Sequence, residues 1–287
     1  FVNELTKERI EKKSCYDTCK EILGGGVGSV ANSAQIAFST DFLASSYSLP
    51  KQIQGKVIDF IAKLQENPAL PSLNVEKIRD AFDTHICSLR IDDAYRVIAS
   101  RTDGSGTFML LWVDHHDEAY EWARRRRCKI NPVTGAIQVY VVQETKDEPA
   151  HSDVTYLFSA VSNDQLLLLA VPTDLFILTR KIKTVEEFKK FKNSFPIDAY
   201  ENLNWIADGF PVDEVINMIL SERCASDESI SEDDFEKALN NPITQMAFTV
   251  INGEKELRDI MSAPLEKWRV FLHPVQRKIV SQQYNGP

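Results

Sequence analysis

Apolar positions from residue 34 onward repeat first with the period of a strand and then with that of a helix. Ile36 and Phe38 predict a short strand, and Asp41–Leu49 predicts a helix that Pro50 stops. A longer helix is predicted over Gln52–Glu66. Its apolar residues recur at helical intervals, namely at Ile53, Val57, Phe60, Ile61 and Leu64.

Three strands and a short helix are predicted next. Ile86–Ile91 alternates, Tyr95–Arg101 is rich in strand-forming residues, and Phe108–Val113 is nearly all apolar. The glycines between the last two supply the positive-φ positions of a hairpin, and Glu118–Arg127 predicts a closing helix. The order strand, two helices, three antiparallel strands predicts a compact α+β domain of about ninety residues.

The rest of the chain is predicted to be mainly helical, after a strand at Ala136–Val142. Thr184-Val-Glu-Glu187 has the form of a capping box, so Thr184 is expected to begin a helix that runs through Phe191. Phe248–Ile251 predicts one more strand and Glu254–Met261 a further helix. Prolines expected at first helical positions open two others, Pro196 before residues 197–208 and Pro211 before residues 212–221.

The first 33 residues divide into a polar segment and a tether. Residues 1–23 carry apolar positions that match a helical period only loosely, and Gly24–Ser29 has almost no side chains that can pack. Two interpretations stay open: residues 1–23 are a separate fused peptide, or they are a natural N-terminal helix on a loose hinge. The predicted organisation is a helical peptide (1–23), a linker (24–33), an α+β domain (34–128), a connecting strand and loop (129–153), a mainly helical domain (154–262) and the start of another domain (263–287).

Charge separates the two halves of the chain. The net charge of −9 is made up almost entirely by residues 129–287, which carry 16 basic and 24 acidic side chains, whereas residues 34–128 carry 12 and 13. Because nucleic-acid binding depends on local Lys and Arg density, any such contact is expected in the first half, at Arg124, Arg125, Arg126 and Arg127. The absence of a long apolar run or a signal peptide, and five scattered cysteines, favour a cytoplasmic protein without membrane contact.

Two stretches around the predicted second and fourth strands resemble a known family. Ser88-Leu-Arg-Ile-Asp-Asp-Ala-Tyr-Arg-Val-Ile98 and Leu110-Leu-Trp-Val-Asp-His-His-Asp-Glu-Ala-Tyr120 are similar to segments of the RelE/ParE toxin superfamily. The resemblance covers about residues 34–127 and implies that fold for the α+β domain. It also implies candidate catalytic residues for RNA cleavage: Arg96, Tyr120 and His116, with His115 beside them and Arg90 and Lys77 as supporting cations.

A third stretch resembles UvrD/Rep-like DNA helicases. Pro264-Leu-Glu-Lys-Trp-Arg-Val-Phe-Leu-His-Pro-Val-Gln-Arg-Lys-Ile-Val280 is similar to the helicase segment that holds the adenine-reading glutamine, which implies that Gln276 contacts ATP in the intact helicase. No G-x-x-x-x-G-K-[ST] loop is present. The expectation is therefore an accessory region that ends before the phosphate-binding loop. ATP, magnesium and DNA would belong to the parent helicase, and no cofactor is expected here.

Three functional hypotheses follow for the toxin-like domain. Asp114, Asp117 and Glu118 surround the candidate histidines with negative charge, which would repel a scissile phosphate and favours a non-catalytic domain that contacts protein or nucleic acid. The alternatives are an mRNA endoribonuclease domain fused to a helicase, and a toxin-like domain held by an antitoxin-like or partner peptide at residues 1–23. No metal site is expected, because the adjacent residues Asp114–Asp117 would point in different directions at a strand end.

Overall fold

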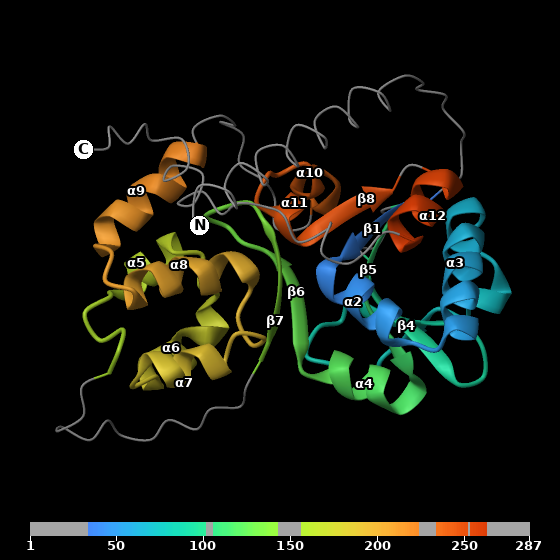
Figure 1. The fold of residues 1–287 in the computed structure, drawn as a ribbon, viewed down its shortest axis with the longest axis horizontal. Helices are drawn as coiled ribbons and strands as arrows, with labels where there is room; N and C mark the ends of the chain where they lie inside the picture. The colour runs from blue at the N-terminus through green and yellow to red at the C-terminus, as the bar shows by residue number, and fades with distance from the viewer. Residues whose placement is uncertain (1–33, 102–105, 143–155, 224–233, 252, 263–287) are drawn as a thin grey trace, which may run out of the picture.

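The computed structural model describes residues 34–101, 106–142, 156–223, 234–251 and 253–262. They form a mixed α+β structure with one large sheet, one small hairpin and two groups of helices (Figure 1). The predicted peptide at 1–23, the linker at 24–33 and the helicase-like stretch at 263–287 lie outside the described residues. Among the helices described, none is long and apolar enough to cross a bilayer.

The large sheet has six strands in the order β2-β3-β4-β5-β1-β8. Five of them come from the first part of the chain: β1 (Gln35–Ser39), β2 (Glu76–Lys77), β3 (Ile86–Arg90), β4 (Tyr95–Ser100) and β5 (Thr107–His115). β2 to β5 are antiparallel neighbours, while β1 lies parallel to β5. The parallel pair is possible because the two helices that follow β1 carry the chain to β2 at the far edge of the sheet, from which β3, β4 and β5 lead back to β1. The predicted strand–helix–helix–strand order is confirmed.

The two predicted helices cover one face of this sheet. Ser39 caps α2 (Thr40–Ser48) by accepting a hydrogen bond from the Phe42 amide at 3.0 Å. α3 (Lys51–Glu66) buries the stripe that its sequence predicts, with Val57, Phe60, Ile61 and Leu64 in the core. Alternate strand residues such as Leu89, Val97 and Leu110 complete that apolar core from the sheet.

The opposite face carries α4 (His116–Arg124), which packs Ala119, Trp122 and Ala123 against the sheet. The predicted helix over Glu118–Arg127 is therefore wrong at its C-terminal end, because residues Arg126–Ile130 form a strand, β6. Cys128 and Ile130 alternate with exposed Lys129, and the Cys128 amide donates to the Asp83 carboxylate at 2.8 Å. Burial of alternate side chains thus outweighs the helical propensity of the arginines.

β6 pairs antiparallel with β7 (Ile137–Val141), and this hairpin lies between the large sheet and a helical group (Figure 1). The helical group shares one apolar core, which includes Phe158, Leu166, Phe188 and Leu203. Its elements are α5 (Asn163–Leu168), η2 (Thr173–Leu175), α6 (Phe176–Lys181), α7 (Val185–Lys190), α8 (Ile197–Ala207) and α9 (Val212–Arg223). Thr184 caps α7 as predicted, accepting a hydrogen bond from the Glu187 amide at 3.1 Å.

Polar side chains join the hairpin to the helical group. Gln138 of β7 donates to both carboxylate oxygens of Asp198 in α8, at 2.9 and 2.8 Å, and to the Ala170 carbonyl at 2.8 Å. Arg127 of β6 donates to Asp174 at 2.7 Å, and the Tyr140 hydroxyl donates to the same carboxylate oxygen at 2.8 Å. These bonds attach the hairpin to the helical group, and the bond between the Cys128 amide and Asp83 attaches it to the part that contains the large sheet.

The last described segment returns to the large sheet. The sequence groups residues 248–262 with the helical region, but β8 (Phe248–Ile251) pairs antiparallel with β1, and α12 (Glu254–Ser262) packs in the core beneath α2 and α3. Before it come α10 (Phe235–Leu239) and α11 (Thr244–Ala247), which lie near the α4 face. Phe248 and Ile251 point to opposite faces of the sheet, and each packs into the apolar core on its own face. β8 also covers the edge of β1, which would otherwise be open.

Candidate functional site

The strand register places the two candidate arginines of β3 and β4 side by side. Arg90 is paired with Arg96 across β3 and β4, and Arg96 is paired with Asp114 across β4 and β5. Directly opposed residues point to the same face of a sheet, here the face that carries α4. The structure therefore brings together a row of two cations and one carboxylate, which includes the candidate residues Arg90 and Arg96.

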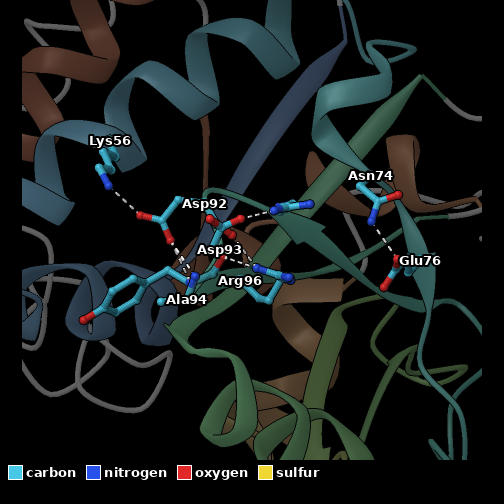
Figure 2. Close-up of polar contacts among 9 residues, drawn as sticks. Lys56, Asn74, Glu76, Asp92, Asp93, Ala94 and Arg96 are labelled. Atoms are coloured by element: carbon cyan, nitrogen blue, oxygen red, sulfur yellow. Dashed lines mark hydrogen bonds and ion pairs between the residues drawn. The ribbon is translucent and has the colours of Figure 1, made fainter.

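Arg96 is used to hold its own hairpin turn. Its guanidinium donates from one nitrogen to the Asp92 carbonyl at 2.6 Å and to the Tyr95 carbonyl at 3.0 Å (Figure 2). Such bonds satisfy carbonyl oxygens of a tight turn; the Tyr95 carbonyl also accepts from the Ile91 amide at 3.2 Å, so removing the guanidinium would take away one of its two donors. The side chain is half-buried, so its geometry is that of a turn-stabilising arginine.

The other charges of this turn are paired as well. Arg90 donates to Asp93, and Lys56 from α3 donates to Asp92 at 2.6 Å (Figure 2). Asp92 also accepts from the amides of Ala94 and Tyr95, each at 2.9 Å. Burial alone would raise the pKa of Asp92, but the Lys56 and backbone hydrogen bonds outweigh it and lower that pKa below its ordinary value.

Tyr120 lies in a short hydrogen-bonded chain on the same face. Its hydroxyl is 2.9 Å from the Ser88 hydroxyl and donates to a Glu76 carboxylate oxygen at 3.3 Å. The other Glu76 oxygen accepts from the Asn74 amide group at 2.6 Å (Figure 2). Lys77, the supporting cation of the resemblance, is next to Glu76 in β2 and exposed. Ser88 precedes Arg90 by two positions, so both side chains point to the α4 face.

The two candidate histidines lie at the start of α4 and face different neighbours. The His116 ring stacks on the Tyr120 ring at 4.5 Å between centroids, and its Nδ1 atom is 3.0 Å from Asp117. His115 lies edge-on to Tyr95 at 5.7 Å and is 3.3 Å from Glu118. The hydrogen bond from His116 is the main cause that lowers the pKa of Asp117. His116 and Tyr120 are thus brought together, with His115 turned toward Tyr95.

The four-arginine run is divided by the end of α4. Arg126 lies over the Trp122 ring at 4.0 Å and donates to the Trp122 carbonyl, and burial lowers its pKa to about 10. Arg127 is bound to Asp174, and Arg125 is 3.0 Å from Glu121 on the exposed helix surface. Only Arg124 and Arg125 are exposed, so the run does not form one continuous cationic patch.

The groups to which these side chains are hydrogen-bonded were not predicted from the sequence. Ser88 and Glu76 follow from strand alternation once the register is known, but Lys56 of α3 and the turn carbonyls are set by packing distant in sequence or by turn geometry. Gln276 lies outside the described residues. In the part of the chain that the structure describes, no three His, Cys, Asp or Glu side chains are grouped as metal ligands.

Comparisons with known proteins assign no family. No family model matches the chain, and no curated protein matches it. Among solved structures, a chain of the RelBE2 toxin–antitoxin complex from Mycobacterium tuberculosis is similar at 22% identity, over 31% of this chain and 98% of that one, with a TM-score of 0.26. A TM-score and an identity this low do not establish a shared fold or a shared activity.

Proposed function

We propose that this chain is a non-catalytic accessory region of a UvrD/Rep-like DNA helicase, in which the six-stranded sheet and α4 form a toxin-like contact module. The module would regulate or recruit the motor through a protein or nucleic-acid partner. ATP, magnesium and DNA are the ligands of the parent helicase in this proposal.

One observation carries the non-catalytic part of the proposal. Each of the four side chains that RNA cleavage would need is bonded within the chain: Arg96 to turn carbonyls, Arg90 to Asp93, Tyr120 to Ser88 and Glu76, and His116 to Asp117. A phosphate would have to displace those partners and also approach Glu76, Asp93 and Asp114. The negative charges of these carboxylates oppose the binding of an anionic phosphate.

The helicase part is supported by the sequence likeness of residues 264–280. We expect the product of the complete gene to hydrolyse ATP in a DNA-dependent manner, with Gln276→Ala raising KM for ATP more than it lowers kcat, because a lost adenine contact weakens binding of ground state and transition state alike. Gln282→Ala is the matched control and should leave KM unchanged. A complete gene product without DNA-dependent ATPase activity would overturn the helicase proposal.

An RNA-cleaving activity is the second candidate, and one observation favours it. His116 and Tyr120 are stacked, and Tyr120 is hydrogen-bonded to Ser88, two positions from Arg90 on the same face. Groups that could move a proton and stabilise charge thus share one face of the sheet. Cleavage of mRNA that Arg96→Ala abolishes, in a variant that remains folded, would establish this activity and overturn the non-catalytic proposal.

A further inference from the structure

The β2–β3 loop, residues 78–85, carries two exposed rings that are three positions apart in the sequence. Phe82 is 40% exposed, and among the Phe, Tyr and Trp side chains that the structure describes it alone is exposed rather than buried or half-buried. The His85 side chain is 44% exposed. An aromatic ring in water favours a ligand with flat apolar faces, because stacking removes apolar area of both partners from water.

Hydrogen bonds fix the backbone that presents these rings. The Phe82 amide donates to the Arg124 carbonyl at the end of α4 at 3.2 Å. Asp83 is buried, and its carboxylate accepts from the His85 amide at 2.9 Å and from the Cys128 amide of β6 at 2.8 Å. The loop is therefore bonded to both α4 and β6, so little conformational entropy is lost when a ligand contacts it.

The same carboxylate also orients the His85 ring. The Nδ1 atom of His85 lies 3.2 Å from Asp83 Oδ1, within hydrogen-bond distance. This contact limits the orientations of the ring, while much of the side chain stays in water. Asp83 thus positions both rings, Phe82 through the adjoining backbone and His85 through direct bonds.

Two exposed arginines belong to the same region. Arg79 lies three positions before Phe82 in the loop, and Arg124 is the residue whose carbonyl accepts from the Phe82 amide. Within the described residues, neither guanidinium forms an ion pair. A guanidinium in this state offers a planar fork of donors that fits a phosphate. The exposed carboxylate of Asp80 beside Arg79 offsets part of the positive charge, so phosphate contacts supplement stacking here and do not replace it.

We propose that the β2–β3 loop and the C-terminal end of α4 form a binding site for single-stranded DNA, in which one base stacks on Phe82 and a neighbouring base on His85. Arg79 and Arg124 bind phosphates of the same strand. A single strand is favoured over a duplex because only unstacked bases offer free faces to side-chain rings. The site reads no sequence, since every nucleotide has a base face and a phosphate. It extends the proposed function and rests on it only for the choice of DNA over RNA.

Fluorescence anisotropy of a labelled oligothymidylate of about 15 nucleotides, titrated with the full chain at low ionic strength, tests the proposal. We expect Phe82→Ala to raise Kd by about tenfold, the effect of losing one base–aromatic stack. Ile177→Ala removes another exposed apolar side chain, in α6, and as the matched control should leave Kd unchanged. Because both positions are exposed, both variants should keep the urea midpoint of the unmodified chain. Absent binding, or the same Kd for the unmodified chain and a folded Phe82→Ala, would overturn the proposal.

The salt dependence of binding separates phosphate contact at this site from general charge attraction. For a single strand, the logarithm of the binding constant falls with the logarithm of the salt concentration by about 0.7 per phosphate contact, so Arg124→Gln should make this slope shallower by about 0.7. Lys190→Gln, on the exposed surface of α7, removes the same charge and should not change the slope. An unchanged slope for Arg124→Gln would contradict the proposed site.

Two further oligonucleotides identify the form of nucleic acid that binds. A DNA duplex of the same length should bind more weakly than oligothymidylate, and oligouridylate no more tightly. Equal or tighter binding of the duplex, or tighter binding of oligouridylate, would show that the site is not one for single-stranded DNA. These results are independent of the ATPase activity of the complete gene product, which tests the helicase proposal separately.

Discussion

A single buried carboxylate, Asp198, makes the helical group sensitive to pH. Burial raises its pKa to about 6, although the Gln138 and backbone hydrogen bonds oppose that rise. The folded state thus binds this proton more tightly than the unfolded state does, where the pKa is near 3.8. Stability from this group is greatest below pH 4, is lost as pH rises from about 4 to about 6, and stays lost above that range.

We therefore predict that Asp198→Asn stabilises the chain at pH 7 by about 2–3 kcal/mol, since a neutral amide avoids the cost of burying a charge. Its gain over the unmodified chain should shrink toward zero by pH 4. Urea denaturation between pH 4 and 8 measures this difference, with Asp59→Asn on the exposed side of α3 as the control. An unchanged or reduced stability of Asp198→Asn at pH 7 would show that the ionised form is the one the fold favours.

The side-chain directions of the candidate site were predictable, whereas its bonds were not. Strand alternation places Ser88 and Arg90 on one face, and the register of β3 and β4 pairs Arg96 with Arg90 on that face. The partners of Arg96 are carbonyls whose directions depend on how the Asp92–Tyr95 turn folds, which the sequence indicates only as a turn. The run Arg124–Arg127 shows the same limit, because a polar run has no period that separates a helix end from a strand.

At the scale of elements, Arg96 is expected to stabilise the β3–β4 hairpin. Arg96→Ala removes two hydrogen bonds to turn carbonyls, and we predict a loss of about 1–2 kcal/mol in the free energy of unfolding. Arg96→Lys should recover only part of this loss, since an ammonium group lacks the planar geometry of guanidinium. Urea denaturation with an unchanged m-value checks both variants; equal stability of all three proteins would mean that the arginine is held available for a ligand.

Element types were easier to predict than element partners. α3 and the Thr184 cap depend on residues close in sequence, so periodicity and local hydrogen bonding sufficed. Phe248–Ile251 was correctly predicted as a strand, but its pairing with β1 joins residues from opposite ends of the chain. The amphipathic pattern of Glu254–Met261 likewise predicts a helix without indicating that α2 and α3 cover it.

At the scale of the whole molecule, the β6–β7 hairpin connects the helical group to the large sheet, because its side chains belong to the apolar cores of both. Arg127 and Gln138 bind Asp174 and Asp198 of the helical group, while Cys128 and Ile137 belong to the core of the large sheet. Of the run Arg124–Arg127, Arg127 is thus bonded to Asp174 and joins the hairpin to the helical group. Arg124 and Arg125 are the exposed members of this run, so the run does not form one continuous cationic patch.

An mRNA cleavage assay on translating ribosomes would distinguish a non-catalytic module from a ribonuclease. The full chain and Arg96→Ala would be added to a translation reaction at equal concentrations, with a ribosome-dependent nuclease as the positive control, and new mRNA 5′ ends would be mapped by primer extension. We expect the same 5′ ends for both proteins as for buffer alone, because Arg96, Arg90 and Tyr120 are each bonded to other groups of the chain and carboxylates lie beside them. New, site-specific 5′ ends that appear with the unmodified chain and disappear with folded Arg96→Ala would contradict it.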